Sequence, residues 1–201
     1  MTALTRRTLI GTGAALGLGA ALPTAAQAHP LPSRRGRGDL YRWARDTWHC
    51  LATMTNRDTG LITDHIEGDL TQPSGYTSPT NIAGYLWGIL AAKRLGFIGR
   101  REATWRANQT LETLQGMERH RPSGMFYNWY HDDTAELLRI WPGGGPILPF
   151  ISSVDMGWLG AATWAIRNGL PGARRRADAL WDDFRWDVFF DTEFVRKPGA
   201  N

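Results

Sequence analysis

The chain of 201 residues has a single cysteine, Cys50, which excludes an internal disulfide and leaves its stability to packing. Because Cys50 lies among Trp48, Leu51 and Met54, we expect a small buried hydrophobe rather than a catalytic thiol. The sequence also lacks the His-Glu-x-x-His, Gly-x-Ser-x-Gly and Walker motifs. These absences exclude most metalloenzyme and serine-hydrolase classes.

Metal-binding side chains are few and unfavourably placed. They are adjacent at 131–133, which reads His-Asp-Asp, and at 64–65, which reads Asp-His. Adjacent loop residues more often point apart into water than toward one ion. We therefore expect neither a metal nor another cofactor.

A strong excess of one charge is also missing. The formal net charge is +4, and Arg6 and Arg7 belong to a leader without acidic residues, so the remainder carries +2. The other basic residues are scattered except at 34–37 and 174–176, which we interpret as solvated surface. Nucleic acid is therefore not an expected partner.

A long apolar run occurs only near the N-terminus. Residues 5–10 read Thr-Arg-Arg-Thr-Leu-Ile, a Gly/Ala-rich apolar stretch follows, and 26–28 read Ala-Gln-Ala. This order predicts a twin-arginine-type signal peptide over 1–28, with a general secretory signal as the alternative. No later run reaches the roughly 18 apolar residues of a membrane-spanning helix. We expect a secreted protein with no membrane contact after cleavage, consisting of a basic linker (29–38) and one domain (39–201).

Apolar residues recur at three- and four-residue steps in five segments, which predicts helices over about 39–55, 79–96, 100–120, 153–169 and 171–184. Ser78-Pro79 is typical of a helix start and Gly96 of a helix end. Strand signals are confined to short pieces within 121–150 and at 188–190. Paired helices with large loops at one end indicate a mainly α fold, either an α/α toroid or part of one.

Aromatic residues are plentiful, and all ten tryptophans follow the leader. Sugar rings pack their C–H faces on aromatic planes and need polar partners at the rim, so tryptophans beside amides and hydroxyls favour carbohydrate recognition. Trp129, next to Asn128 and Tyr130, and Trp158, close to Asp155, fit this role as well as they fit packing. We expect core packing for the tryptophans at helical spacing: Trp43, Trp48, Trp105, Trp164 and Trp181.

Asp155 is the best single carboxylate candidate, because it lies in the first turn of an apolar helix directly after a loop. The alternative is an acid that only stabilises its own helix start. Glycoside hydrolysis ordinarily needs a second carboxylate, for which Asp64 and Asp132 are the candidates.

Three segments in this order resemble a known family: 76–86 (Tyr-Thr-Ser-Pro-Thr-Asn-Ile-Ala-Gly-Tyr-Leu), 124–130 (Gly-Met-Phe-Tyr-Asn-Trp-Tyr) and 151–159 (Ile-Ser-Ser-Val-Asp-Met-Gly-Trp-Leu). They are similar to the glucoamylase-like (α/α)6-toroid family that includes endo-β-1,2-glucanases, and to the related segment of cyclic β-1,2-glucan synthases. The resemblance extends from about Trp43 to Phe190. It implies helical hairpins of an incomplete toroid, the N-terminal half only, with long loops and short strand pieces.

The resemblance also implies a carbohydrate-active protein with a glucan cleft at its loop-rich end, in which Asp155 is the candidate for acid/base catalysis or sugar binding. One departure from the family pattern is His131, which stands where an Asp often follows the Asn-Trp-Tyr segment, with Asp132 next. The implied substrate-binding residues, to which the aromatic analysis adds Trp158, are Thr77, Ser78, Thr80, Asn81, Asn128, Trp129 and Tyr130.

Three alternatives for function remain open. The first is an exported glycoside hydrolase acting on a β-glucan, with β-1,2-glucan favoured. The second is a non-catalytic glucan-binding half-toroid, and the third is a fragment without a stable function of its own. The open face of half a toroid also predicts self-association.

Overall fold

The computed structural model describes residues 34–190. The expected signal peptide (1–28) and the start of the expected linker (29–33) lie outside the described residues. The main elements are the helices α1 (Arg34–Thr53), α2 (Pro79–Leu95), α3 (Arg100–Gly116), α4 (Ser153–Gly169) and α5 (Arg174–Asp182). The smaller elements are two 3-10 turns, η1 (Pro171–Ala173) and η2 (Trp186–Phe189), and the strands β1 (Tyr76–Thr77), β2 (Arg119–His120), β3 (Met125–Phe126) and β4 (Tyr130–His131). The predicted mainly α class with short strand pieces is confirmed.

Several elements differ from the sequence prediction, among them the last helix, whose predicted span of 171–184 is divided into η1 and the shorter α5. Helix α1 begins at Arg34, so residues 34–38 of the expected linker are helical, as an existing helix extends at little cost. Helix α3 ends at Gly116, because β2 pairs with β3 in a short hairpin instead of continuing the helix. The strand predicted at 188–190 is wrong: η2 covers most of this run, which pairs with no strand within 34–190.

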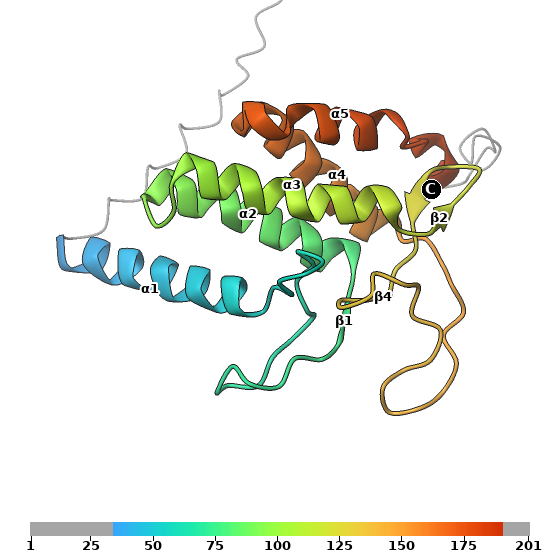
Figure 1. The fold of residues 1–201 in the computed structure, drawn as a ribbon, viewed down its shortest axis with the longest axis horizontal. Helices are drawn as coiled ribbons and strands as arrows, with labels where there is room; N and C mark the ends of the chain where they lie inside the picture. The colour runs from blue at the N-terminus through green and yellow to red at the C-terminus, as the bar shows by residue number, and fades with distance from the viewer. Residues whose placement is uncertain (1–33, 191–201) are drawn as a thin grey trace, which may run out of the picture.

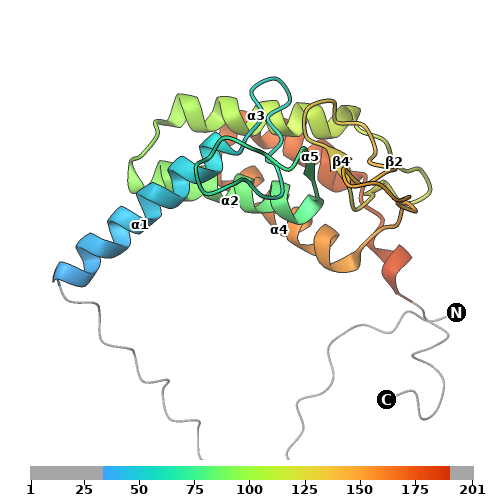
Figure 2. The same ribbon diagram turned by 90° about the horizontal axis from the view of Figure 1, so that it is seen from below.

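The helices form a curved array of hairpins (Figures 1 and 2). Helices α2 and α4 lie side by side and share the most extensive helix contact. Helix α3 packs on α2, and α5 packs on both α4 and α3, so these two form the second layer. Helix α1 lies along α2 at one edge. This arrangement is the partial α/α toroid expected from the sequence. Over residues 34–190, no helix is apolar enough over a sufficient length to cross a membrane.

The core between the layers is mainly aliphatic and draws on all helices after α1. Several tryptophans expected in it lie elsewhere: Trp43 and Trp105 are each 57% exposed and Trp164 is 46% exposed. Trp48 and Trp181 are partly buried and pack against the core. Leu, Ile and Met fill the interior more readily than the large indole, as the fully buried side chains show: Ile82, Leu86, Ile89, Leu111, Leu114, Met156, Leu159 and Ile166.

Two hydrogen bonds fix the relative direction of α2 and α4. In their first turns, Thr80 Oγ1 donates to Asp155 Oδ1 at 2.6 Å. In their last turns, Lys93 Nζ donates to the Gly169 carbonyl at 2.8 Å. The helices are therefore parallel, and their N-termini lie at the same end of the molecule.

Local sequence explains where both helices begin. Ser78 caps α2 by accepting from the Asn81 N–H at 3.3 Å, and Pro79 occupies the first turn, where no N–H partner is lost. Ser152 caps α4 by accepting from the Asp155 N–H at 3.2 Å. Gly96 ends α2 at a φ of 78°, a conformation that favours glycine.

The long loops gather at the end that holds these two helix N-termini (Figure 1). The loop before α2 meets the loop before α4 through the antiparallel pair β1 and β4, in which Tyr76 is opposite His131 and Thr77 opposite Tyr130. Side chains that are far apart in the sequence are thereby brought to the start of α2.

Candidate functional site

Asp155 lies at the junction of three elements. It is half-buried in the first turn of α4, where Thr80 from α2 holds Oδ1. The Asn128 amide, oriented to satisfy both of its neighbours, donates to Oδ2 at 3.0 Å and accepts from Trp129 Nε1 at 3.1 Å. Both carboxylate oxygens are thus fixed by donors from other segments, which is more than capping α4 requires. The side chain is presented as a hydrogen-bond acceptor or base.

The partial charges at the ends of the helix backbones also favour a carboxylate at this position. The N-termini of α2 and α4 both carry partial positive charge, and Asp155 contacts the first turn of each. An anion at this position interacts favourably with two helices at once. The same end of the molecule therefore suits negative charge, whether it belongs to a side chain or develops on a bound ligand.

Asp64, in the loop before β1, is a second carboxylate that contacts the same turn of α2. Asn81 Nδ2 donates to its Oδ1 at 3.0 Å, and its Oδ2 lies 3.2 Å from His65 Nδ1. Ser78 in turn hydrogen-bonds to Asn81 Oδ1. The start of α2 thus connects Asp64 to Asp155. We call the set Asp64, Thr80, Asn81, Asn128 and Asp155 the carboxylate cluster.

Three aromatic rings border this cluster. Trp129 lies edge-to-face against Tyr76 at 5.5 Å and against Trp141 at 5.3 Å, and Tyr76 lies against Trp141 at 5.5 Å. We call these residues the aromatic triad. It meets the carboxylate cluster directly where Trp129 hydrogen-bonds to Asn128, and it also packs, through Tyr76, against His65, the neighbour of Asp64. The chain thereby combines acceptor groups and aromatic surface at one end of the fold.

Trp158 is placed separately from the triad. It is 47% exposed on α4 and packs edge-to-face on Trp87 of α2 at 5.1 Å. It lies one helical turn after Asp155, so it extends the same side of α4 away from the loops.

Tyr130 and Thr77 do not reach this surface, contrary to the binding roles expected for them. Both are fully buried and face each other across β1 and β4. The Tyr130 hydroxyl donates to the Glu118 carbonyl at 2.7 Å and accepts from the Tyr127 N–H at 2.8 Å, and burial raises its pKa. These two residues position the loops rather than offer contacts to a ligand. Ser78, at 3% exposure, acts in the same way through its cap.

Asp132, the other candidate for the second carboxylate, is also buried, at 6% exposure. Burial raises its pKa, a hydrogen bond from Thr63 opposes this shift, and nearby Asp133 adds to it. The accessible second carboxylate is Asp64. Tyr76 and Trp141 were not singled out from the sequence as site residues. The only local signal for Trp141 is its place before the Pro-Gly-Gly-Gly-Pro turn at 142–146.

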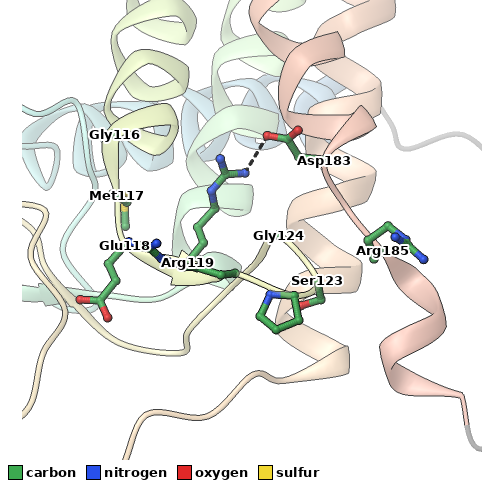
Figure 3. Close-up of a pocket in the computed structure, with 10 residues that line it drawn as sticks. Gly116, Met117, Glu118, Arg119, Ser123, Gly124, Asp183 and Arg185 are labelled. Carbon is green, nitrogen blue, oxygen red and sulfur yellow. Dashed lines mark hydrogen bonds and ion pairs between the residues drawn. The ribbon is translucent and has the colours of Figure 1, made fainter.

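A cavity of about 650 Å³ lies near the C-terminal end of α3 and shares no residue with either group (Figure 3). Two of its arginines are already paired: Arg119 with Asp183 at 3.1 Å and Arg185 with Asp187 at 3.4 Å. Its charge is largely neutralised within the protein. Among residues 34–190, no three His, Cys, Asp or Glu side chains converge as a metal site would require.

Comparison with known proteins places this geometry in context. Residues 42–193 match the family model described as protein of unknown function, DUF3131. The cyclic β-(1,2)-glucan synthase NdvB of Rhizobium meliloti (strain 1021) is 30% identical over 133 residues, which cover 65% of this chain and 4% of the synthase.

Solved structures share the fold at low sequence identity. A glucoamylase candidate from Bacteroides fragilis superposes with a TM-score of 0.62 and 18% identity, over 76% of this chain and 37% of that one. A β-1,2-glucanase from Parabacteroides distasonis superposes with a TM-score of 0.60 and 16% identity, over 75% of this chain and 21% of that one. The chain thus spans well under half the length of the proteins that it matches, and the resemblance expected from the sequence motifs is confirmed.

Proposed function

The chain belongs to the DUF3131 family, and from this premise we propose that it is a carbohydrate-active protein of glycoside-hydrolase type that acts on a β-glucan through Asp155. The observation that carries the proposal is the fixation of both Asp155 oxygens by Thr80 and Asn128, beside an aromatic surface. The names of the similar synthase and glucanase favour β-1,2-glucan as the substrate.

The roles of the residues follow from their contacts. Asp155, which accepts on both oxygens, activates water or binds sugar hydroxyls as a base. Asp64 supplies the second carboxylate that glycoside hydrolysis requires, and His65 beside it is a group through which a proton can move. Thr80, Asn81 and Asn128 position the two carboxylates, and Trp129 offers a ring face to the C–H side of a sugar.

A second candidate function is glucan binding without cleavage. The observation that favours it is the openness of α4 beside Asp155, where Val154 is 67% and Trp158 is 47% exposed. Hydrolytic sites generally exclude water around the reacting groups, which strengthens their electrostatic effects. A site that is open on this side holds a sugar chain more readily than it cleaves one.

Two further proposals concern the surroundings of the protein. We propose export through the twin-arginine-type signal read from residues 1–28, which leaves the mature protein outside the cell, where polysaccharide is available. We also propose that the exposed apolar side of α4 promotes self-association, since apolar surface of this kind is rarely left open to water.

The deciding experiment compares wild type with Asp155→Asn on linear β-1,2-glucan. Reducing ends measure cleavage, and isothermal titration calorimetry measures binding. We expect cleavage by wild type to fall by about 10²- to 10⁴-fold in the variant, because the amide cannot act as a base, with a similar melting temperature. Asp58→Asn, which alters an exposed loop acid, is the matched control.

The other outcomes are equally informative. Binding by wild type without new reducing ends would replace hydrolysis by the binding function. No binding and no cleavage by a protein that melts cooperatively would overturn both. Absence of a cooperative melt would support the third alternative, a fragment without a stable function.

A further inference from the structure

The loop that carries Trp141 is built to hold this side chain in place. The backbone N–H of Trp141 donates to the Gly145 carbonyl at 3.0 Å, and the backbone N–H of Gly144 donates to the Trp141 carbonyl at 2.8 Å. A bridge between Ile140 and Pro146 closes the turn below. Gly144 and Gly145 have φ values of 91° and 94°, which only glycine adopts without strain. A tight turn that requires glycine at two positions thus holds Trp141 in place.

The aromatic triad leaves surface for a ligand. The rings of Tyr76, Trp129 and Trp141 meet at steep interplanar angles of 64° to 80°, so none stacks flat on another. All three are half-buried rather than enclosed. Parts of their faces therefore remain accessible to the flat C–H side of a sugar ring.

Two polar groups of the triad have no hydrogen-bond partner in the part of the chain that the structure describes. Trp129 uses its indole N–H to bind Asn128, whereas the Trp141 indole N–H and the Tyr76 hydroxyl make no hydrogen bond to any residue within 34–190. The Tyr76 hydroxyl is close enough to Asp64 for that charge to add to the effect of burial in raising its pKa. Aromatic faces with free donors at their edges match the mixed surface of a sugar.

The triad is also displaced from the reacting carboxylate. Asp155 contacts Asn128, Asn128 contacts Trp129, and Trp141 lies one ring beyond Trp129. Among residues 34–190, no hydrogen bond joins Trp141 directly to Asp155. We propose that Trp141 and Tyr76 form a second glucosyl-binding position, which holds a sugar unit remote from the unit at Asp155. This inference rests on the proposed function, because it takes the ligand to be a β-glucan.

A remote position makes binding depend on chain length. A disaccharide occupies the position at Asp155 and gains little from Trp141, whereas a longer chain contacts both places. The experiment measures binding of β-1,2-linked glucose disaccharide and hexasaccharide by isothermal titration calorimetry. We expect Trp141→Ala to weaken hexasaccharide binding by about tenfold, in line with the loss of one aromatic contact, and to leave disaccharide binding within about twofold.

Two further variants keep the test independent of folding. Tyr76→Phe removes only a hydroxyl, so it preserves the triad and is expected to weaken hexasaccharide binding by a few fold. Trp105→Ala removes a tryptophan on α3 that is more exposed than Trp141 and lies outside both site groups, and it is expected to change the binding of neither ligand. Melting temperatures of all variants provide the control for packing.

The outcomes separate this inference from the proposed function. Unchanged hexasaccharide binding in Trp141→Ala, or an equal loss for both ligands, would overturn the second position while leaving Asp155 in its role. Absence of binding by wild type at millimolar sugar would instead overturn the proposed function.

Discussion

The two ends of the α2–α4 pair perform the same structural task with different chemistry. At one end Thr80 joins the helices through Asp155, and at the other end Lys93 joins them through the Gly169 carbonyl. Each link places a favourable charge at the helix termini, negative at the N-termini and positive at the C-termini. The Lys93 link consists of one hydrogen bond, from the ammonium group to the Gly169 carbonyl. The Asp155 link continues into Asn128, Trp129 and the aromatic triad.

This difference shows how a functional end can be recognised. A cap or a cross-link needs one partner, and any further partners that fix the same group need another explanation. Asp155 has two side-chain donors from two different segments besides its helix dipole. The comparison predicts that changes at the Asp155 end alter glucan chemistry, whereas matched changes at the Lys93 end alter only stability.

The largest effect after Asp155 itself is expected at Asn128. Asn128→Leu leaves Asp155 Oδ2 and Trp129 Nε1 without their shared partner. We expect cleavage of β-1,2-glucan to fall by about 100-fold because the carboxylate loses its position, and stability to fall by about 1–3 kcal/mol. Initial rates of reducing-end release and chemical denaturation measure the two effects.

Asn168→Leu is the matched control, because Asn168 bonds to the Trp164 carbonyl near the other end of α4. If Asn128→Leu cleaves glucan at the wild-type rate, the proposed positioning role is lost and the two ends of the helix pair become equivalent.

A direct test removes one hydrogen-bond donor at each end of the α2–α4 pair. Thr80→Val removes the hydroxyl bound to Asp155 and is expected to lower cleavage by about tenfold, as for one hydrogen bond to a charged group. Lys93→Met removes the ammonium bound to the Gly169 carbonyl and is expected to cost about 1 kcal/mol of stability without changing the rate. Equal effects on the rate at both ends would contradict the comparison.

The sequence predicts the termini of α2 and the start of α4 well, because the signals there are local. Ser78-Pro79, Gly96 and the position of Asp155 mark helix termini, so the bounds of α2 and the acid at the start of α4 are correct. These features depend on hydrogen bonds within four residues, which a linear pattern records.

The remaining features depend on contacts between distant segments. Tyr130 belongs to the same aromatic run as Trp129, but the register of β4 on β1 turns Tyr130 inward and leaves Trp129 half-buried. The link between Asn81 and Asp64 joins residues 17 positions apart across a loop. Asp64 and Asp132 are equivalent candidates in the sequence, and the structure separates them because Asp132 is buried and Asp64 is bound by Asn81.

Self-association is expected to depend on the exposed apolar side of α4. The exposed apolar side of α4 carries Val154 and Trp158 on the functional half of the helix pair. We expect Trp158→Arg to raise the dissociation constant of the self-associated species by about tenfold or more, because it places a charge in an apolar contact. Sedimentation equilibrium measures this, with Trp105→Arg on α3 as the control. A wild-type protein that is monomeric at all concentrations would exclude the proposal.

The smallest expected effect concerns pH and separates Asp132 from the two accessible acids. Burial raises the pKa of folded Asp132 above its ordinary value, so the folded state holds this proton more strongly than the unfolded state. The resulting contribution to stability is complete below the pKa of Asp132 in the unfolded state and is lost as the pH rises through its pKa in the folded state.

Asp132→Asn removes this dependence, so the stability of the variant relative to wild type should improve between about pH 4 and pH 7. Denaturant unfolding at both pH values measures the difference, with Asp58→Asn as the exposed control. A constant difference between variant and wild type across this range would show that burial of Asp132 has no titrating consequence, and would contradict its raised pKa.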